Sequence, residues 1–211
     1  MTPPGERDGL NPALETVTHF VDATLAEAAR KNADQLACCP GCKTCCMGPF
    51  PISQLDALRL REGLARLDEH DAARAARVRR RARKSAARLA PDYPGDPKTG
   101  VLDEGGDAEE LFAGFADIEA CPVLDPQSGL CDLYAARPLP CRRFGQPVRA
   151  GAAVGVCELC FPDSSDEEIA ASAVELDLDA LEAPLLRKFE EGGGAKGRTI
   201  VTFALAMEGR A

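Results

Sequence analysis

The chain has 211 residues, ten of them cysteines, and 34 acidic against 25 basic side chains give it a net charge of -9 at pH 7. A chain of this length can bury a core without disulfides, and its acidity disfavours general affinity for nucleic acid. It contains neither a secretory signal pattern nor a run of roughly 18 to 20 apolar residues that would span a membrane. We therefore expect a cytoplasmic protein without membrane contact, whose clustered cysteines are metal ligands or redox groups rather than structural disulfides.

Periodic apolar residues predict two amphipathic helices near the N-terminus. Asn11-Pro12 is typical of a helix start, and apolar side chains then recur every three or four residues to about residue 36. The second helix is expected to begin at Ser53, which forms a capping-box pattern with Asp56 three residues later. Its apolar face would consist of leucines: Leu55, Leu58, Leu64 and Leu67.

A basic helical insertion is expected at about 70–90, after a break at His70 and Asp71. Residues 72–91 contain eight basic and no acidic side chains, and the buried face of this helix would be mostly alanine. Because the rest of the chain is acidic, we expect the segment to pair with an acidic surface of the same chain or of a protein partner. Nucleic-acid contact is disfavoured, since the segment carries no aromatic or base-reading side chains.

The remaining segments mix loops and short helices. Prolines and glycines predict a loop without regular structure over 91–106, and a short helix is expected at 107–117. Ser165 and Glu168 begin a predicted late helix that Pro184 should kink or split. The closing run TIVTFALAM is too short to distinguish a strand from a helical turn.

The expected fold is mainly α, a small helical domain with irregular cysteine-rich loops organised around a metal site. We expect three segments to share this single domain. They are an N-terminal helix at 1–37, a cysteine-cluster core at 38–162 and a C-terminal helical segment at 163–211. The sequence does not indicate the oligomeric state.

The cysteines form two groups along the chain. The first follows the pattern C-x2-C-x2-C-C: Cys39, Cys42, Cys45 and Cys46. The second lies downstream: Cys121, Cys131, Cys141, Cys157 and Cys160. Two residues between cysteines let both sulfurs turn toward one metal, as in zinc knuckles and iron–sulfur sites. Neighbouring side chains in extended backbone point in opposite directions, so Cys45 and Cys46 are expected to face different sites or different irons. Ten cysteines suffice for two sites, and the spacing leaves their partition open.

These residues closely resemble the YkgJ-type cysteine-cluster family of zinc- or iron-chelating proteins, which has the motif CxxCxxCC. The resemblance rests on CCPGCKTCC, and on CPVLDPQSGLCDLYAARPLPCR beginning at Cys121. Flagellin lysine methylases carry a similar motif, for which an iron–sulfur cluster is implied at the family level. The resemblance therefore implies metal binding and favours a 4Fe–4S cluster over Zn²⁺. Cys38 departs from the pattern and is interpreted as a bystander, and either Cys157 or Cys160 would complete an eight-cysteine set.

Three other residues are candidates for supporting a bound metal or cluster: Tyr134, Arg137 and Arg142. The two arginines would place positive charge near thiolates, or else form ordinary salt bridges with the acidic surface. Tyr134 would donate a hydrogen bond to a sulfur or carbonyl, or else pack its ring beside the cysteine loop.

Three functions stay open. The leading hypothesis is a metal-binding protein that acts in metal handling, electron transfer or the maturation of a partner. The alternatives are an iron–sulfur-dependent, methyltransferase-like group-transfer enzyme and a zinc-stapled protein-interaction module. Whether the chain is an enzyme is undecided, because the sequence shows no known catalytic signature and indicates no catalytic residue.

Overall fold

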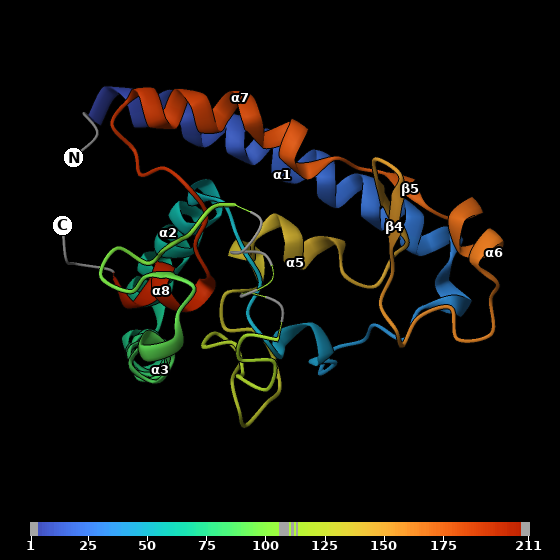
Figure 1. Ribbon diagram of the computed structural model, residues 1–211, viewed down its shortest axis with the longest axis horizontal. Helices are drawn as coiled ribbons and strands as arrows, with labels where there is room; N and C mark the ends of the chain where they lie inside the picture. Colours follow the sequence, from blue (N-terminus) through green and yellow to red (C-terminus); the bar gives the residue numbers. More distant parts are fainter. Residues whose placement is uncertain (1–3, 106–109, 111, 113, 208–211) are drawn as a thin grey trace. The chain divides into compact units, whose positions relative to one another are not determined.

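The computed structural model describes residues 4–105, 110, 112 and 114–207, and it confirms the mainly α fold (Figure 1). The chain divides into two compact units. Unit 1 contains the described residues of Lys43–Pro138 and Gly194–Ala211, and unit 2 those of Thr2–Cys42 and Leu139–Gly193. The division therefore falls inside the C-x2-C-x2-C-C motif, directly after Cys42. Single-domain packing of the three predicted segments stays a prediction.

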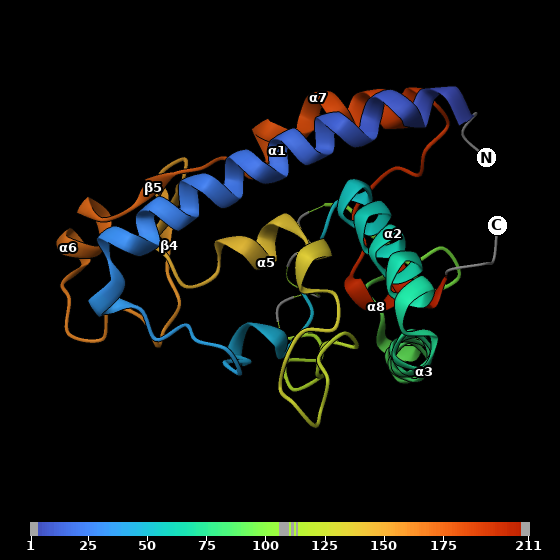
Figure 2. The ribbon, with the colours of Figure 1, turned by 180° about the vertical axis from the view of Figure 1, so that it is seen from behind.

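Unit 1 is built on α2 (Gln54–His70), α3 (Ala72–Leu89) and α8 (Val201–Ala206), which lie together in both views (Figures 1 and 2). The predicted helix starts are confirmed, because the Ser53 hydroxyl accepts a hydrogen bond from the Asp56 amide at 3.0 Å and the Asp71 side chain caps α3. The core shared by these helices includes fully buried aliphatic residues: Ile52, Leu60, Leu64, Val78 and Leu205.

The buried face of α3 is less alanine-rich than predicted. It consists of Ala75, Val78, Ala82, Ser85 and Leu89. The other alanines of the helix are exposed or half-buried, so valine and leucine supply much of the apolar area that α3 buries.

The C-terminal run TIVTFALAM, which the sequence left open between a strand and a helical turn, begins with a β-bridge and continues as a helix. Thr199 and Ile52 exchange two backbone hydrogen bonds of 2.8 and 3.0 Å in an isolated antiparallel bridge. The chain then turns into the buried helix α8.

The expectation of no regular structure at 91–106 is wrong. Gly95–Asp96 (β1) and Val101–Leu102 (β2) form a short antiparallel hairpin. A Cβ on Gly95 would lie 2.2 Å from the carbonyl oxygen of Val101, so glycine permits this close strand approach. The turn is held by Asp96, whose carboxylate accepts a hydrogen bond from the Lys98 amide at 2.9 Å. The helix predicted at 107–117 lies partly outside the described residues.

Unit 2 pairs a long helix with a small sheet. α1 (Pro4–Lys31) and α7 (Leu178–Glu191) lie side by side in both views (Figures 1 and 2). The unit also contains α5 (Leu139–Arg143) and α6 (Asp166–Ala171). The sheet has the order β4-β3-β5, with β3 (Val148–Ala150) antiparallel to β4 (Ala153–Gly155) and parallel to β5 (Val174–Glu175). The core residues come from these elements and from the link between β5 and α7: Val21, Leu25, Leu139, Val148, Leu176 and Leu178.

Two predicted helix boundaries in unit 2 are wrong. α1 begins at Pro4 rather than near residue 12, because buried Leu10 extends the apolar face one turn ahead of buried Leu14. The late helix is split into α6 and α7 by β5, and Pro184 lies inside α7. The split arises because β5 pairs with β3 and Asp177 then caps a new helix by accepting from the Ala180 amide at 3.0 Å. The capping box of Ser165 and Glu168 is confirmed.

Within the described ranges, every helix is too short or too polar to cross a bilayer.

Candidate metal centre

Four cysteines of unit 1 gather where two loops meet, and we call them the unit 1 thiols: Cys45, Cys46, Cys121 and Cys131. Cys45 and Cys46 lie in a short 3₁₀-helix, Thr44–Cys46. The Cys121 amide donates a hydrogen bond to the Cys46 carbonyl at 2.8 Å, which places the two loops side by side. Cys131 joins them through an antiparallel bridge with Leu124. Cys121 and Cys131 both pack against the core of the unit.

The basic helix α3 holds the loops that carry two of these thiols. Arg81 donates a hydrogen bond to the Pro122 carbonyl at 2.7 Å and another to the Asp132 carboxylate. Arg74 pairs with the same carboxylate, whose side chain is only 2% exposed. Pro122 and Asp132 directly follow Cys121 and Cys131 in the sequence. The expected pairing of the basic segment with acidic groups of the same chain is thus observed, and its pairing with a partner protein stays a prediction.

Three of the unit 1 thiols, those of Cys45, Cys121 and Cys131, have raised pKa values. The pKa of Cys45 is raised first by its hydrogen bond with the Cys46 thiol and then by burial, and the Arg137 charge opposes this increase. Burial raises the pKa of Cys121 from 9.0 to about 12 and also raises that of Cys131, which Arg137 again opposes. A metal bound at these thiols would therefore displace protons at neutral pH.

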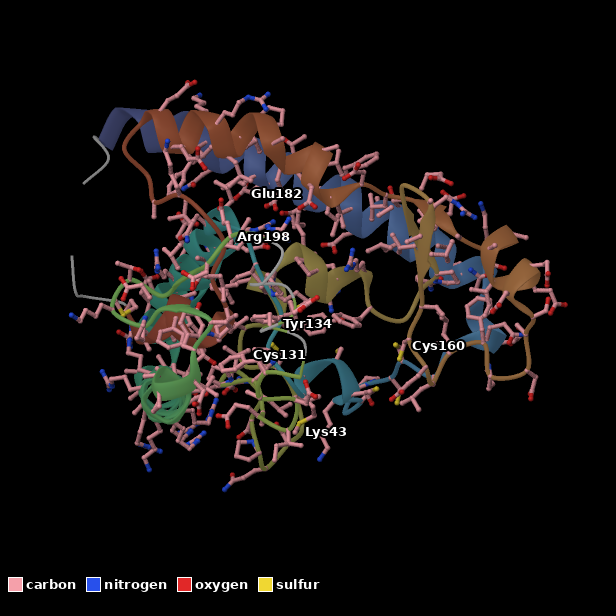
Figure 3. All side chains as sticks on the ribbon, viewed as in Figure 1. Lys43, Cys131, Tyr134, Cys160, Glu182 and Arg198 are labelled. Carbon is pink, nitrogen blue, oxygen red and sulfur yellow. The ribbon has the colours of Figure 1, made fainter. Side chains whose placement is uncertain are left out.

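The supporting residues predicted from the sequence occupy different places. The Arg137 guanidinium lies 4.0 Å from the ring centroid of Tyr134. Tyr134 is 63% exposed and lies in the same region as Cys131 in Figure 3. The charge of Arg137 acts on Cys45 and Cys131 within unit 1. Arg142 is buried and donates a hydrogen bond to the Asp22 carboxylate of α1. Arg142 therefore forms the ordinary salt bridge that was one of its two predicted roles.

A second group forms in unit 2, and we call its members the unit 2 thiols: Cys38, Cys42, Cys157 and Cys160. The Cys160 thiol is in hydrogen-bonding contact with the thiols of Cys38 and Cys157. Cys42 lies close enough for its charge to raise the pKa values of Cys38 and Cys157. Burial is the main reason that the pKa of Cys38 is raised to about 12 and that of Cys157 is raised as well. Figure 3 shows Cys160 with sulfur atoms beside it.

Backbone contacts explain why these segments of unit 2 meet. The Phe161 amide donates to the Gln35 carbonyl at 2.8 Å, and the Cys160 amide donates to the Cys157 carbonyl at 2.9 Å in a tight turn. Phe161 is buried. Its backbone adopts the left-handed conformation at φ 57°, which is uncommon for a non-glycine residue. These contacts hold the C-x2-C turn against the segment that leads into Cys38.

Cys38 is interpreted from the sequence as a bystander, whereas its thiol contacts the Cys160 thiol in the structure. Although the residue as a whole is exposed, its Sγ packs against Gly145, where an added Cβ would lie only 2.6 Å from the sulfur. Cys39, the expected ligand, is exposed, and Cys141 is half-buried in α5. The extra thiol before the motif was the available signal, but its spacing from Cys42 does not show which of two adjacent cysteines turns inward.

Ionised cysteines are ligands for both zinc and iron, and each group places several cysteines close together. Within the described residues, no three cysteine, histidine or acidic side chains converge into a finished ligand shell. A metal would therefore have to draw the cysteine loops together. Coupling of metal binding to loop closure is common in small cysteine-ligated sites.

The fold and the clustered thiols together define a class of protein, the mainly α cysteine-cluster metal chelators. Residues 37–161 match the CxxCxxCC family, described as "Putative zinc- or iron-chelating domain". The match covers more than half of the chain, so the chain belongs to this family, as the cysteine spacing predicted. Membership supports metal binding in general. Comparisons with curated proteins and with solved structures give no match.

Proposed function

We propose that the protein holds a 4Fe–4S cluster, or zinc in its place, and acts in metal handling, electron transfer or the maturation of a partner protein. The observation that carries the proposal is the gathering of Cys45, Cys46, Cys121 and Cys131 beside the charge of Arg137. Four thiolates complete one cluster or one zinc site. A nearby guanidinium favours the ionised thiols that either metal requires.

Adjacent Cys45 and Cys46 favour the cluster over zinc at this group. A cluster offers separate irons to two neighbouring cysteines, whereas a single zinc ion would require both sulfurs on one small shell. Bound iron–sulfur would supply one-electron chemistry whose potential depends on nearby charge and hydrogen bonds. The protein's own contribution is to hold the loops through Arg74 and Arg81 and to place Arg137 near the sulfurs.

The test is an anaerobic purification of the full chain, followed by visible absorbance and by analysis for iron, zinc and acid-labile sulfide. We expect a brown protein with about four irons and four sulfides per chain. A colourless protein with zinc and no iron would overturn the cluster and favour the zinc-stapled interaction module. Absence of all three elements, even after reconstitution with iron and sulfide or with zinc, would overturn metal binding itself.

A pocket in unit 2 favours group transfer as a second candidate function. Its volume is about 370 Å³, the size of small-molecule sites. The lining is largely apolar and includes Phe144, Val148 and Val154, with Arg143 and the unit 2 thiol Cys157 among its residues. An apolar molecule with an anionic group would fit this lining. Binding of such molecules to the metal-loaded protein, measured by calorimetry, would support an enzymatic role, and failure of a broad panel to bind would count against it.

A further inference from the structure

We infer that the unit 2 thiols form a second metal site, which holds a single zinc ion and is distinct from the site of the unit 1 thiols. The inference rests on the proposed function, since it assumes that the clustered thiols bind metal. It assigns Cys38 as a ligand in place of the exposed Cys39.

Each group is assembled by contacts inside its own unit. The unit 1 thiols depend on the hydrogen bond from Cys121 to Cys46 and on the bridge between Leu124 and Cys131. The unit 2 thiols depend on the hydrogen bond from Phe161 to Gln35. Each of these contacts joins residues of one unit, and we therefore expect each group to bind metal on its own.

The arrangement and spacing of the unit 2 thiols fit a single zinc ion. Cys160 already contacts the sulfurs of Cys38 and Cys157, and a tetrahedral ion holds its thiolates in this kind of mutual proximity. The spacing is C-x3-C and C-x2-C, with no two adjacent ligands. Both features suit one zinc ion with four sulfur ligands.

The backbone at Gly145 leaves room for the Cys38 thiol. Gly145 has a φ of 104°, and a Cβ there would lie 2.6 Å from the Cys38 sulfur. Glycine therefore meets two demands at this position, because it tolerates the left-handed backbone and leaves room for the thiol. A surface cysteine without a role would require no such accommodation.

The experiment compares Cys160→Ser with Cys121→Ser in the full chain, purified anaerobically with a reductant and analysed for zinc, iron and sulfide. We expect Cys160→Ser to lose about one zinc per chain and to keep its visible absorbance and iron. Cys121→Ser should lose the iron and sulfide and keep the zinc. Cys38→Ser should behave as Cys160→Ser does, and Cys39→Ser, its adjacent matched control, should keep both metals.

Loss of both metals in each of the first two variants would show one shared site and overturn the inference. Unchanged zinc in Cys38→Ser and Cys160→Ser would overturn it as well. If circular dichroism shows that Cys160→Ser does not fold, the Cys38→Ser variant decides the test, because Cys38 is exposed. Cobalt(II) then takes the place of zinc as a probe. Its thiolate absorbance reports the number of sulfur ligands, which Cys38→Ser should reduce. Two zincs and no iron in the wild type, one of them lost in each variant, would overturn the cluster of the proposed function and leave this inference standing.

Discussion

The two thiol groups of this protein have the same number of sulfurs but different supports. The unit 1 thiols are anchored by a hydrophobic core and by arginines of α3 that bind the residues after Cys121 and Cys131. The unit 2 thiols lie on loops that are held by backbone hydrogen bonds and by the space at Gly145. Cys42 and Cys45 belong to one compact motif but to different units, and in the proposed assignment they serve different sites.

Metal removal should give the largest effect and should act unequally on the two groups. Structural thiolate sites contribute on the order of 10 kcal/mol of binding free energy that is coupled to folding. We expect a strong chelator to lower the melting temperature markedly and to withdraw zinc before iron, because the exposed Cys38 opens the unit 2 thiols to solvent. Timed elemental analysis and calorimetric melting provide the measurement. Simultaneous loss of both metals would contradict the difference between the two groups.

Replacement of Arg81 should weaken the unit 1 thiols alone. Arg81→Ala removes one hydrogen bond to the buried Asp132 carboxylate and another to the Pro122 carbonyl. The ion pair between Arg74 and Asp132 stays in place. Because Arg74 still compensates the Asp132 charge, the lost hydrogen bonds are expected to lower the free energy of unfolding by about 1.5 to 3 kcal/mol, and the iron content should fall while zinc stays constant.

The matched control for this prediction is Arg83→Ala, because Arg83 is an exposed cation on the same helix. Chemical denaturation and metal analysis of the two variants give the comparison. Equal effects of both variants would show that α3 acts through its general positive charge rather than through the contacts of Arg81.

Replacement of Gly145 should weaken the unit 2 thiols alone. Gly145→Ala puts a methyl group against the Cys38 sulfur and forces alanine into a backbone conformation at φ 104°, a strain of about 1 to 3 kcal/mol. We expect zinc to be lost or bound several-fold more weakly, with iron retained. Gly151→Ala is the control, since Gly151 also has a positive φ, 61°, but open space around its Cβ position. Competition with a zinc indicator measures the difference, and similar zinc affinities in the two variants would contradict the role of Gly145.

The smallest effect should be a pH dependence of the metal-free protein. Burial raises the pKa of Cys121 from 9.0 to about 12, so the folded state keeps a proton that the unfolded state releases. This contribution to stability is complete below pH 9 and is lost as the pH rises toward 12. The melting temperature of the metal-free protein should therefore decrease above pH 9, and Cys121→Ser should decrease less. Equal slopes for the wild type and the variant would contradict the assignment.

Local features of this protein could be predicted from the sequence because neighbouring residues determine them. The caps at Ser53 and Ser165 depend on side chains that reach amides three residues away. The family was recognisable from the cysteine spacing, because that spacing reflects the chemistry of thiolate ligands rather than the path of the chain.

Other features depended on contacts between residues far apart in the chain. The spacing to Cys42 favours Cys39 over Cys38 as a ligand, and only the approach of Gly145 and Cys160 to the Cys38 sulfur favours Cys38. The role of the basic helix was open in the sequence, because pairing of Arg74 and Arg81 with Asp132 joins residues more than fifty positions apart.

The sequence by itself determined that this protein is mainly α and belongs to a family of cysteine-rich chelators, since helix periodicity, caps and ligand spacing are short-range patterns. Only the tertiary structure decided which thiols lie together. The physical reason is that a thiol has no preferred partner along the chain. Its neighbours are chosen by core packing, backbone hydrogen bonds and ion pairs that bring the loops of each unit together.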